Sequence, residues 1–598
     1  MTIWENLTSG AKYLYLGLEN IFSWTWNGLK SVFSSIDNSF FSTDTTWDNN
    51  FENVVFYGNY SIYGSNYQVE DISWHKITKP VYAFAMVGNS NPNPDGVSGE
   101  WKAYENYRTL PSTIGGYATG KTGTANDKYI FEIFSTDPYS DLHYINPSKY
   151  NNGTKNKQNA WEYGKNTIAK FIEAANNSGK PAILSIGGWS CGITLLDAMK
   201  KDPSEFAKAV ADFINTTVPD ACKWTDGSKG FKGVDIDIEP YENNWAKMSK
   251  DEIKSVVESM AALRKALGDK LISFTIGATP NIVKIVQNAG NEYKRDFWQE
   301  INKAVDKVYI MTYDYHGTFD GSSSGTNFHT ALYPDLNEPT TWGENRGKFN
   351  IDSSMKEFSS VLPKDKLLFG VASYGRAYKM REKFSDDEFS QYTTGKKNFV
   401  ADFLYKNFID ASNGDNLTPV YKANTNLASI AGNLGYSEDI YANPHTHNEV
   451  NPADYANLPQ DGTRSDGLDA KINYTQYAKG YSISDMLKNG DMVEALIYIS
   501  YDGKTRTDVI KYKGKDVKIF VDNREQGSTY KIASDDKLIG ACGLNKNGYF
   551  LTYDNPETVA AKAQYCKDNG YGGILHWEAK GDVAGELVTA AADIFGIN

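Results

Sequence analysis

Three acidic residues in one short segment have the spacing that acid–base chemistry requires. Residues 232–240 read Lys-Gly-Val-Asp-Ile-Asp-Ile-Glu-Pro, so that Asp235, Asp237 and Glu239 recur at every second position. In a β-strand, side chains two residues apart share a face and repeat every ~6.5 to 7 Å, so the three carboxyl groups would stand in single file. The intervening valine and isoleucines would form an apolar opposite face.

Three carboxyl groups at this spacing cannot all ionise freely. Mutual repulsion and partial burial raise the pKa of at least one of them. A protonated carboxylic acid beside an ionised one is suited to protonate a glycosidic oxygen. A solvated edge strand and a site for a hard cation are the alternatives. The apolar opposite face disfavours the first, and a divalent-ion loop would require Gly, Asn and backbone carbonyls.

Eight short apolar runs predict the sheet that would carry this segment. They alternate with longer amphipathic stretches, which is typical of repeated β-α units. The predicted strands are 54–58, 81–86, 182–186, 234–238, 271–276, 308–313, 367–371 and 573–577, and the clearest predicted helices are 166–175, 205–216, 250–267 and 555–569. Eight strands with intervening helices predict an α/β fold, a closed (β/α)₈ TIM barrel. Active sites of such barrels lie at the C-terminal ends of the strands, where Glu239 falls.

Two connections are too long for ordinary barrel loops. They cover about residues 88–160 and 380–545, and the second contains strand-like runs at 495–501 and 517–521. We therefore expect an aromatic helical arm over residues 1–50, a catalytic barrel over 51–380, a mixed α+β insertion between strands 7 and 8 over 381–544, and the last barrel strand and helix over 545–598.

The composition excludes some partners. The formal net charge is −13, which disfavours nucleic acid or an anionic membrane because phosphate binding requires clustered Lys and Arg. A neutral substrate is compatible with this charge. Cys191, Cys222, Cys542 and Cys566 have no close spacing, so we expect buried thiols rather than a zinc site. We expect neither a metal nor a cofactor.

The first fifty residues lack the basic n-region, uninterrupted apolar core and small-residue cleavage site of a secretory signal. We expect them to be retained, so that action outside the cell would need non-classical export or a secreted assembly. The segment is too polar to span a bilayer. Its aromatic residues would pack on the barrel, or would dock residues 1–45 onto a protein partner or a membrane interface.

Six fragments, in order along the chain, resemble glycoside hydrolase family 18, the chitinases and their relatives. They are the carboxylate strand, the first strand at 55–64, Ser-Ile-Gly-Gly-Trp at 185–189, Met-Thr-Tyr-Asp at 311–314, Tyr-Gly-Arg at 374–376 and Gly-Gly-Ile-Leu-His-Trp at 572–577. The resemblance covers roughly residues 51–380 and 545–598. The chain departs from the family pattern at Lys232, where Asp is usual, and at Pro240-Tyr241 after Glu239, where an aromatic residue usually comes first.

The resemblance implies substrate-assisted hydrolysis, in which the 2-acetamido oxygen of the substrate is the nucleophile. In this interpretation Glu239 protonates the leaving oxygen and later activates water. Asp237 binds the acetamido N–H and stabilises the oxazolinium intermediate, and Asp235 shares a proton with Asp237. Tyr313 donates its hydroxyl to the acetamido carbonyl.

The resemblance also implies substrate-binding residues around these four. Asp314 would bind sugar hydroxyls, and Trp577 would form an apolar floor under the sugar, although an indole there could equally be barrel core. Tyr374 and Arg376 would contact substrate, with a structural ion pair as the alternative for Arg376. The glycines after Ser185 would allow close packing. Candidate stacking platforms are Tyr57, Tyr63, Trp101, Trp189 and Tyr315.

Several functions remain open at this point. The leading hypothesis is a chitinase that cleaves β-1,4 linkages between N-acetylglucosamine units of chitin or chitooligosaccharides. An endo-β-N-acetylglucosaminidase acting on glycoprotein glycans would use the same residues. A chitin-binding lectin without activity is the third, although such proteins commonly lose the terminal acid, and this chain retains Glu239. The aromatic arm and the long insertion weakly resemble the chitinase subunits of bacterial insecticidal toxin complexes.

Overall fold

The computed structural model describes a large part of the chain after residue 50. The described residues are 51–62, 67–87, 130–131, 133–135, 140–141, 167–189, 191–222, 224, 229–241, 243–292, 296–335, 337–381, 383–408, 470–476, 482–500, 506–521, 533 and 535–597. The predicted arm over residues 1–50 and the candidate platforms Tyr63 and Trp101 lie outside them.

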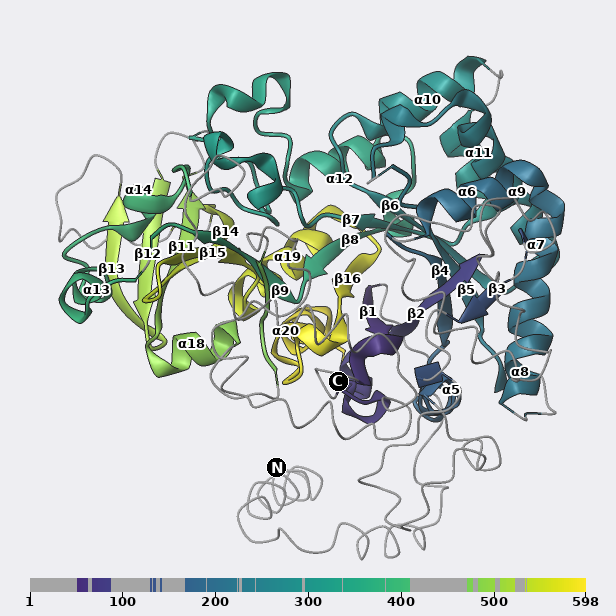
Figure 1. The fold of residues 1–598 in the computed structure, drawn as a ribbon, viewed down its shortest axis with the longest axis horizontal. Helices are drawn as coiled ribbons and strands as arrows, with labels where there is room; N and C mark the ends of the chain where they lie inside the picture. Colours follow the sequence, from purple (N-terminus) through teal and green to yellow (C-terminus); the bar gives the residue numbers. More distant parts are fainter. Residues whose placement is uncertain are drawn as a thin grey trace, which may run out of the picture. The chain divides into compact units, whose positions relative to one another are not determined.

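Eight parallel strands in the described residues close into a barrel (Figure 1). Neighbouring strands pair in chain order, and the last pairs with the first. These strands are β1 (Glu52–Gly58), β2 (Lys79–Val87), β4 (Ile183–Gly187), β5 (Gly233–Asp237), β6 (Leu271–Gly277), β7 (Lys307–Met311), β8 (Leu367–Ala372) and β16 (Gly573–Trp577). All eight predicted strands are confirmed. A short strand, β3 (Ile133–Ser135), pairs antiparallel with β2.

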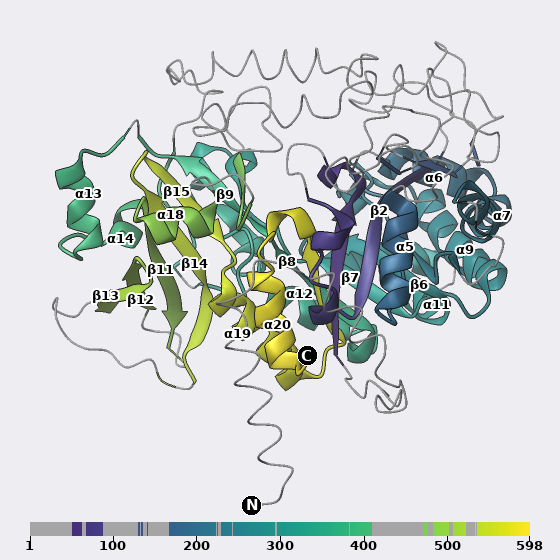
Figure 2. The same ribbon diagram turned by 90° about the horizontal axis from the view of Figure 1, so that it is seen from below.

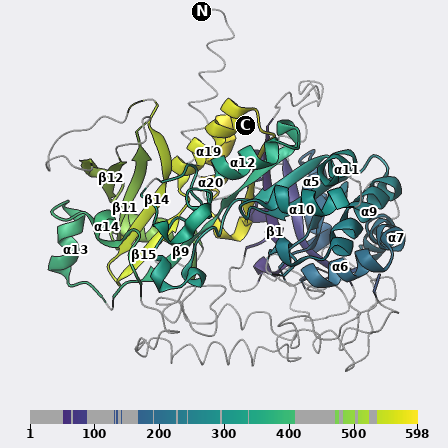
Figure 3. The same cartoon turned by 90° about the horizontal axis from the view of Figure 1, so that it is seen from above.

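Helices surround the barrel, and α6, α7, α9, α10 and α11 lie side by side on its outside (Figure 3). The helices of the barrel are α5 (Thr167–Asn177), α6 (Gly192–Lys201), α7 (Pro203–Asp212) with a π-helical continuation (Phe213–Thr217), α8 (Val218–Ala221), α9 (Lys250–Leu267), α10 (Ile282–Glu292), α11 (Phe297–Ala304), α12 (Ile351–Ser359), α19 (Pro556–Asn569) and α20 (Glu586–Phe595). The predicted helix 250–267 is confirmed by α9. A capping box formed by Ser249 and Glu252 fixes the first turn of this helix.

Side-chain alternation divides the barrel into two apolar layers. Val54 and Phe56 of β1 pack inside the barrel with Leu368 and Leu575. Residues on the opposite faces of the strands join the larger core between the strands and the helices. Each strand is therefore buried on both faces, as expected for a parallel sheet.

A second sheet, entirely antiparallel, lies beside the barrel (Figures 1 and 2). It has the order β10-β9-β15-β14-β11-β12-β13, and within the described residues the helices α13, α14 and α18 belong to the same part of the chain. These elements are β9 (Tyr374–Lys379), β10 (Ala470–Asn473), β11 (Met492–Ile499), β12 (Arg506–Tyr512), β13 (Lys515–Val521), β14 (Lys537–Asn545), β15 (Tyr549–Tyr553), α13 (Asp386–Thr393), α14 (Phe399–Phe403) and α18 (Ile483–Asn489). Because β9 and β15 flank the predicted insertion, the sheet extends beyond 381–544. The domain boundaries themselves stay a prediction.

Two further observations bear on the composition. All four cysteines are buried and none forms a disulfide, as the sequence predicts. None of the helices in the described ranges combines the length and the apolar character needed to cross a membrane.

Candidate active site

Strand β5 points two of the three predicted acids into the barrel. Val234 and Ile236 are fully buried in the core that faces the helices, so the alternating residues Asp235 and Asp237 face the interior. Asp235 is 0% and Asp237 3% exposed. The strand ends at Asp237, and Glu239 lies two residues beyond it, partly exposed, at the C-terminal mouth.

Three hydroxyl groups hold Asp235. Ser185 Oγ donates to Oδ2 at 2.7 Å, and Ser273 Oγ and Thr275 Oγ1 both donate to Oδ1 at 2.8 Å. The strand register explains these contacts, because Ser185 of β4 and Ser273 of β6 are paired with Asp235 on either side. Burial raises the pKa of Asp235, and the three hydrogen bonds oppose that rise.

Asp237 has a carboxyl oxygen that receives no hydrogen bond from its described neighbours. Its Oδ1 is buried and accepts no hydrogen bond within the described part of the chain. Burial, followed by the negative charges of Glu239 and Asp235, raises the pKa of Asp237 well above its usual range. A buried polar atom without a partner is costly, so the site is prepared to receive a donor from a ligand at this atom.

Asn243 contacts the third acid, and the sequence analysis did not identify it. The Nδ2 of Asn243 donates to Glu239 Oε2 at 2.7 Å. The sequence offers one signal for this contact: Asn243 follows Glu239 by four residues, in a predicted loop.

Glycines allow backbone to pack against the acidic strand, as predicted from the Gly-Gly pair after Ser185. A side chain on Gly187, which has φ 121°, would overlap the carbonyl oxygen of Asp237. A side chain on Gly192 at the start of α6 would overlap the carbonyl oxygen of Glu239. The backbone that carries both acids is thus held from one side by residues that must be small.

Tyr313 lies two residues beyond β7, close enough to Asp237 and Glu239 for their charges to act on its hydroxyl. The ring occupies space next to Gly370 of β8, where any Cβ would overlap it. Burial raises the pKa of the Tyr313 hydroxyl well above its usual range, and the charges of Asp237 and Glu239 add to the rise. The hydroxyl therefore stays protonated and able to donate.

The next residue, Asp314, is held by an ion pair. Arg376 Nε donates to Asp314 Oδ1 at 2.8 Å, and His329 Nδ1 lies 3.6 Å from the same oxygen. The side chain of Arg376 is only 7% exposed. Tyr374 is buried with its ring against Tyr313 and His329, at centroid distances of 6.4 and 5.4 Å. The structural ion pair considered for Arg376 is therefore present, while substrate contacts of Tyr374 and Arg376 stay predictions.

Aromatic rings pack together in the barrel interior. Trp577, partly exposed, lies 5.6 Å from the ring of Phe56 and 5.5 Å from that of Phe84. Phe84 is a second residue that the sequence analysis missed; it packs on the barrel interior together with Tyr313 and Trp577. On the loop after β4, Trp189 is 63% exposed, as a stacking platform requires.

Two of the predicted stacking platforms are wrong. Tyr57 is 0% exposed and packs against Phe171 on the helix side of β1, because the neighbouring Phe56 occupies the interior face. Tyr315 is also buried, and its hydroxyl lies 2.7 Å from Ser354 Oγ. Neither ring can receive a sugar.

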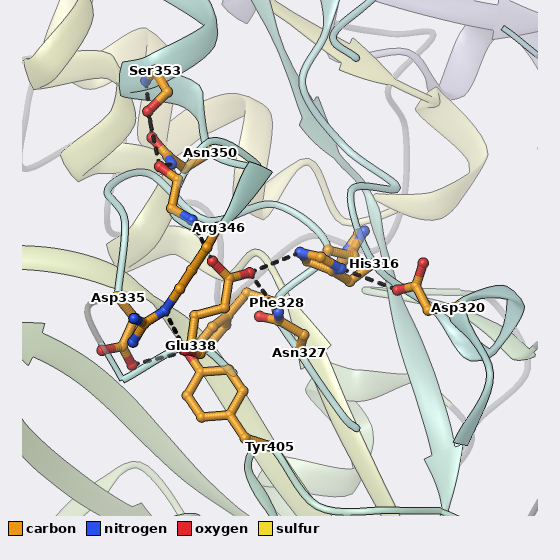
Figure 4. Close-up of polar contacts among 12 residues, drawn as sticks. His316, Asp320, Asn327, Phe328, Asp335, Glu338, Arg346, Asn350, Ser353 and Tyr405 are labelled. Carbon is orange, nitrogen blue, oxygen red and sulfur yellow. Dashed lines mark hydrogen bonds and ion pairs between the residues drawn. The ribbon is translucent and has the colours of Figure 1, made fainter. Parts of the chain in front are cut away.

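A buried histidine fixes the long loop between β7 and α12 (Figure 4). His316 Nδ1 lies 3.0 Å from Asp320 Oδ2, and His316 Nε2 lies 3.3 Å from Glu338 Oε1. Burial alone would lower the pKa of His316, but the two carboxylates outweigh it and raise that pKa, while the pKa of Glu338 is lowered. The loop between β7 and α12 is thus held by charged groups inside the protein. Among the described residues, no group of three or more His, Cys, Asp and Glu side chains could hold a metal ion.

Comparison with known proteins agrees with the fold. A model of the glycosyl hydrolases family 18 matches residues 52–582. Chitinase 1 of Aphanocladium album is 24% identical over 343 residues, which cover 56% of this chain and 63% of that protein. A class V chitinase of Medicago truncatula is 28% identical over 269 residues, covering 43% and 62%. The chain thus spans less than two thirds of the length of these relatives.

Solved structures share the barrel. Chitinase ChiA74 from Bacillus thuringiensis superimposes with a TM-score of 0.53 at 19% identity, covering 90% of this chain and 69% of that one. The catalytic domain of a psychrophilic chitinase B from Arthrobacter TAD20 gives a TM-score of 0.52 at 16% identity, covering 92% and 95%. At such identities the likeness shows the fold.

Proposed function

Because the chain belongs to the glycosyl hydrolases family 18, we propose that it is a chitinase, which hydrolyses β-1,4 linkages between N-acetylglucosamine units with retention of configuration. The observation that carries the proposal is the row formed by Asp235, Asp237 and Glu239. The buried Oδ1 of its middle member accepts no hydrogen bond from the described residues. The hydroxyl of Tyr313, on which the charges of Asp237 and Glu239 act, stays protonated.

In the first step, Glu239 transfers its proton to the glycosidic oxygen as the bond to the anomeric carbon breaks. The acetamido oxygen of the same sugar attacks that carbon and forms a cyclic oxazolinium ion. Asp237 accepts a hydrogen bond from the acetamido N–H at its Oδ1 and offsets the positive charge. Tyr313 donates to the acetamido oxygen and holds it in line for attack.

In the second step, Glu239 acts as a base. Its carboxylate takes a proton from water, the water oxygen bonds to the anomeric carbon, and the ring of the oxazolinium ion opens. Two inversions at one carbon give net retention. Glu239 is again protonated, so the enzyme is ready for another cycle.

Asp235 assists Asp237 by taking up the proton that the two carboxyl groups share. The two carboxyls are both buried and their pKa values are both raised, so they share a proton as a coupled pair. Movement of that proton toward Asp235, which has three hydroxyl donors, leaves Asp237 charged when the oxazolinium ion forms.

Sugar binding is assigned to the side chains around the mouth. Asp314, oriented by Arg376, binds hydroxyl groups, and Trp577 forms the floor under the reacting sugar. Trp189 stacks on a sugar farther along the bound oligosaccharide. Tyr374, whose ring packs against that of Tyr313, is a further proposed substrate contact.

The test is cleavage of N-acetylglucosamine tetramers to hexamers, with products followed by mass spectrometry and the anomer by NMR. Wild type should release β-anomers, and Glu239→Gln should be slower by about 10²–10⁴-fold. Absence of cleavage by wild type, or unchanged cleavage by Glu239→Gln, refutes the proposal. Release of glycan from a high-mannose glycoprotein without cleavage of the oligomers would favour the endo-β-N-acetylglucosaminidase, and binding without cleavage would favour the lectin.

A further inference from the structure

We propose that Asn243 is a positioning residue that orients the acid Glu239 and selects the oxygen from which it donates its proton. The inference rests on the proposed function, because it concerns the same acid. The contact that carries it is the 2.7 Å hydrogen bond from Asn243 Nδ2 to Glu239 Oε2.

The backbone around Asn243 is built to present this side chain. The N–H of Asn244 donates to the carbonyl of Pro240 at 3.0 Å and closes a turn. Tyr241 and Asn243 within it have φ of 49° and 60°, a left-handed conformation that Asn tolerates better than most residues. The asparagine therefore suits both the turn and the contact.

Both ends of the turn are anchored. On one side, the hydroxyl of Tyr241 donates to Glu252 Oε1 at 3.1 Å, and Glu252 is itself fixed by the capping box at the start of α9. On the other side, Trp245 is 2% exposed and packs against Phe274 and Phe297. Asn243 lies between these anchors, so its position does not depend on the substrate.

The end of β6 leaves room for the amide of Asn243, and the hydrogen bond to Glu239 orients it. A Cβ on Gly277 would lie 3.1 Å from both Cγ and Oδ1 of Asn243, so the glycine leaves the room that the amide occupies. The carbonyl side of the amide faces Gly277, and the NH₂ group faces Glu239.

This orientation has a chemical consequence for the acid. In a carboxylic acid, the carbonyl oxygen is the better hydrogen-bond acceptor and the other oxygen carries the proton. Because Oε2 accepts from Asn243, the neutral form of Glu239 carries its proton on Oε1. After the transfer, the same N–H stabilises the carboxylate by a charge-assisted hydrogen bond, without moving.

The experiment compares two substrates that differ in their need for the acid. A GlcNAc tetramer has a poor leaving group and requires protonation, whereas a dinitrophenyl chitobioside releases a stable phenolate and requires little. Asn243→Gly keeps the left-handed backbone and removes the amide. We expect kcat to fall about 10- to 100-fold on the tetramer, with KM and the rate on the dinitrophenyl substrate changed by about twofold or less.

Asn243→Asp is the second variant, because it preserves the shape of the side chain and also tolerates the left-handed backbone. Its carboxylate beside Glu239 favours the protonated acid, so the alkaline limb of the pH profile of kcat should move to higher pH. Asn281→Gly is the matched control: Asn281 also has a left-handed φ of 68° and lies in a loop after a barrel strand, but its side chain is directed to Asn345 at the surface. This control should retain wild-type kinetics.

An equal loss on both substrates, or no loss on the tetramer, would overturn the role of Asn243 even where Glu239→Gln is inactive and the proposed function stands. Wild-type protein inactive on both substrates would overturn the proposed function and this inference with it. Thermal melting of each variant distinguishes a lost fold from a misdirected acid, and a folded Asn243→Asp with an unmoved pH profile would also count against the inference.

Discussion

Ser185 and Asp235 are paired across β4 and β5, and the serine hydroxyl donates to the innermost carboxyl at 2.7 Å. Ser273 and Thr275 complete a shell of neutral donors around Asp235. A buried Arg or Lys in their place would hold the carboxyl ionised. Hydroxyl groups stabilise the carboxylate less strongly, so that Asp235 can exchange a proton with Asp237 during the reaction.

We predict that Ser185→Ala moves the acidic limb of the pH profile of kcat/KM to higher pH. The variant loses a donor to the charged form of Asp235, whose pKa burial already raises, so the pKa rises further. Because the folded pKa of Asp235 then lies still further above the unfolded value of ~3.9, the folded state is destabilised at pH values above ~3.9, where the unfolded chain releases this proton more easily. The loss in the free energy of unfolding should be about 1–3 kcal/mol near neutral pH and smaller in acid, as measured by urea denaturation.

The control is Ser259→Ala. Ser259 is fully buried in α9, and its Oγ has no hydrogen-bond partner within the described ranges. Removing that hydroxyl should leave both the pH profile and the stability close to wild type. A Ser185→Ala variant that behaves like this control would show that the hydroxyl shell does not tune the acids.

We predict that Tyr313→Phe lowers kcat on N-acetylglucosamine oligomers by about 10²–10³-fold, the size of effect known for one donor to a reacting oxygen. The ring still fills the space beside Gly370, so the melting temperature should stay near the wild-type value. Tyr315→Phe removes a hydroxyl that contacts Ser354 inside the protein, and it should reduce stability by about 1 kcal/mol and leave kcat unchanged. The reverse pattern would restore Tyr315 to the site and remove Tyr313 from it.

We predict that the ion pairs of His316 make the loop after β7 more stable in mild acid than in alkali. The folded pKa of His316 is raised, so its contribution is complete below the unfolded value of ~6.5 and is lost as the pH rises through the folded value. The folded pKa of Glu338 is lowered, so its contribution is present above ~4.3 and is lost as the pH falls through the folded value. The contribution is therefore largest between these two limits.

The measurement is urea denaturation of wild type and His316→Gln at about pH 5.5 and about pH 9. The variant should lose about 1–3 kcal/mol more at the lower pH. The exposed His75 provides a control for the replacement of a histidine by glutamine, and His75→Gln should change the free energy of unfolding by less than about 0.5 kcal/mol. An equal loss for His316→Gln at both pH values would mean that the ring acts by packing against Trp342, 4.7 Å away, and not by charge.

The sequence predicts the barrel well because its strands have a clear local signal. Apolar runs of the right length, broken by polar turns, locate all eight strands, and the period of two orients Asp235 and Asp237 within one of them. Alternation fails where both faces of a strand are apolar and aromatic. Phe56 and Tyr57 are neighbours on β1, and only closure of the barrel decides that Phe56 faces inward; Tyr57 was therefore assigned wrongly.

The contacts that set the pKa values and orientations of the acids depend on distances between strands and loops. The pattern of residue types along a single sequence does not give these distances. Ser273 and Thr275 reach Asp235 only through the register of β5 and β6. Phe84 of β2 reaches Trp577 of β16 past the intervening strand β1. Asn243 reaches Glu239 because two left-handed residues turn the loop back. Hydroxyl and amide residues are common in loops and strands, so nothing in the sequence distinguishes these from the rest.

We predict that Trp189→Ala weakens binding of long substrates without affecting the fold. The indole is 63% exposed, and few surface substitutions change stability by more than about 0.5 kcal/mol, so the melting temperature should not move. Covering one ring face with a sugar is worth about 1–2 kcal/mol, which corresponds to a rise in KM of about 5- to 30-fold for the hexamer. Ile193→Ala, at a nearby apolar residue that is 37% exposed, should leave KM unchanged. KM values for the dimer and the hexamer, measured side by side, decide the point: an equal rise for both would place Trp189 beside the reacting sugar, and no rise for either would remove it from the substrate path.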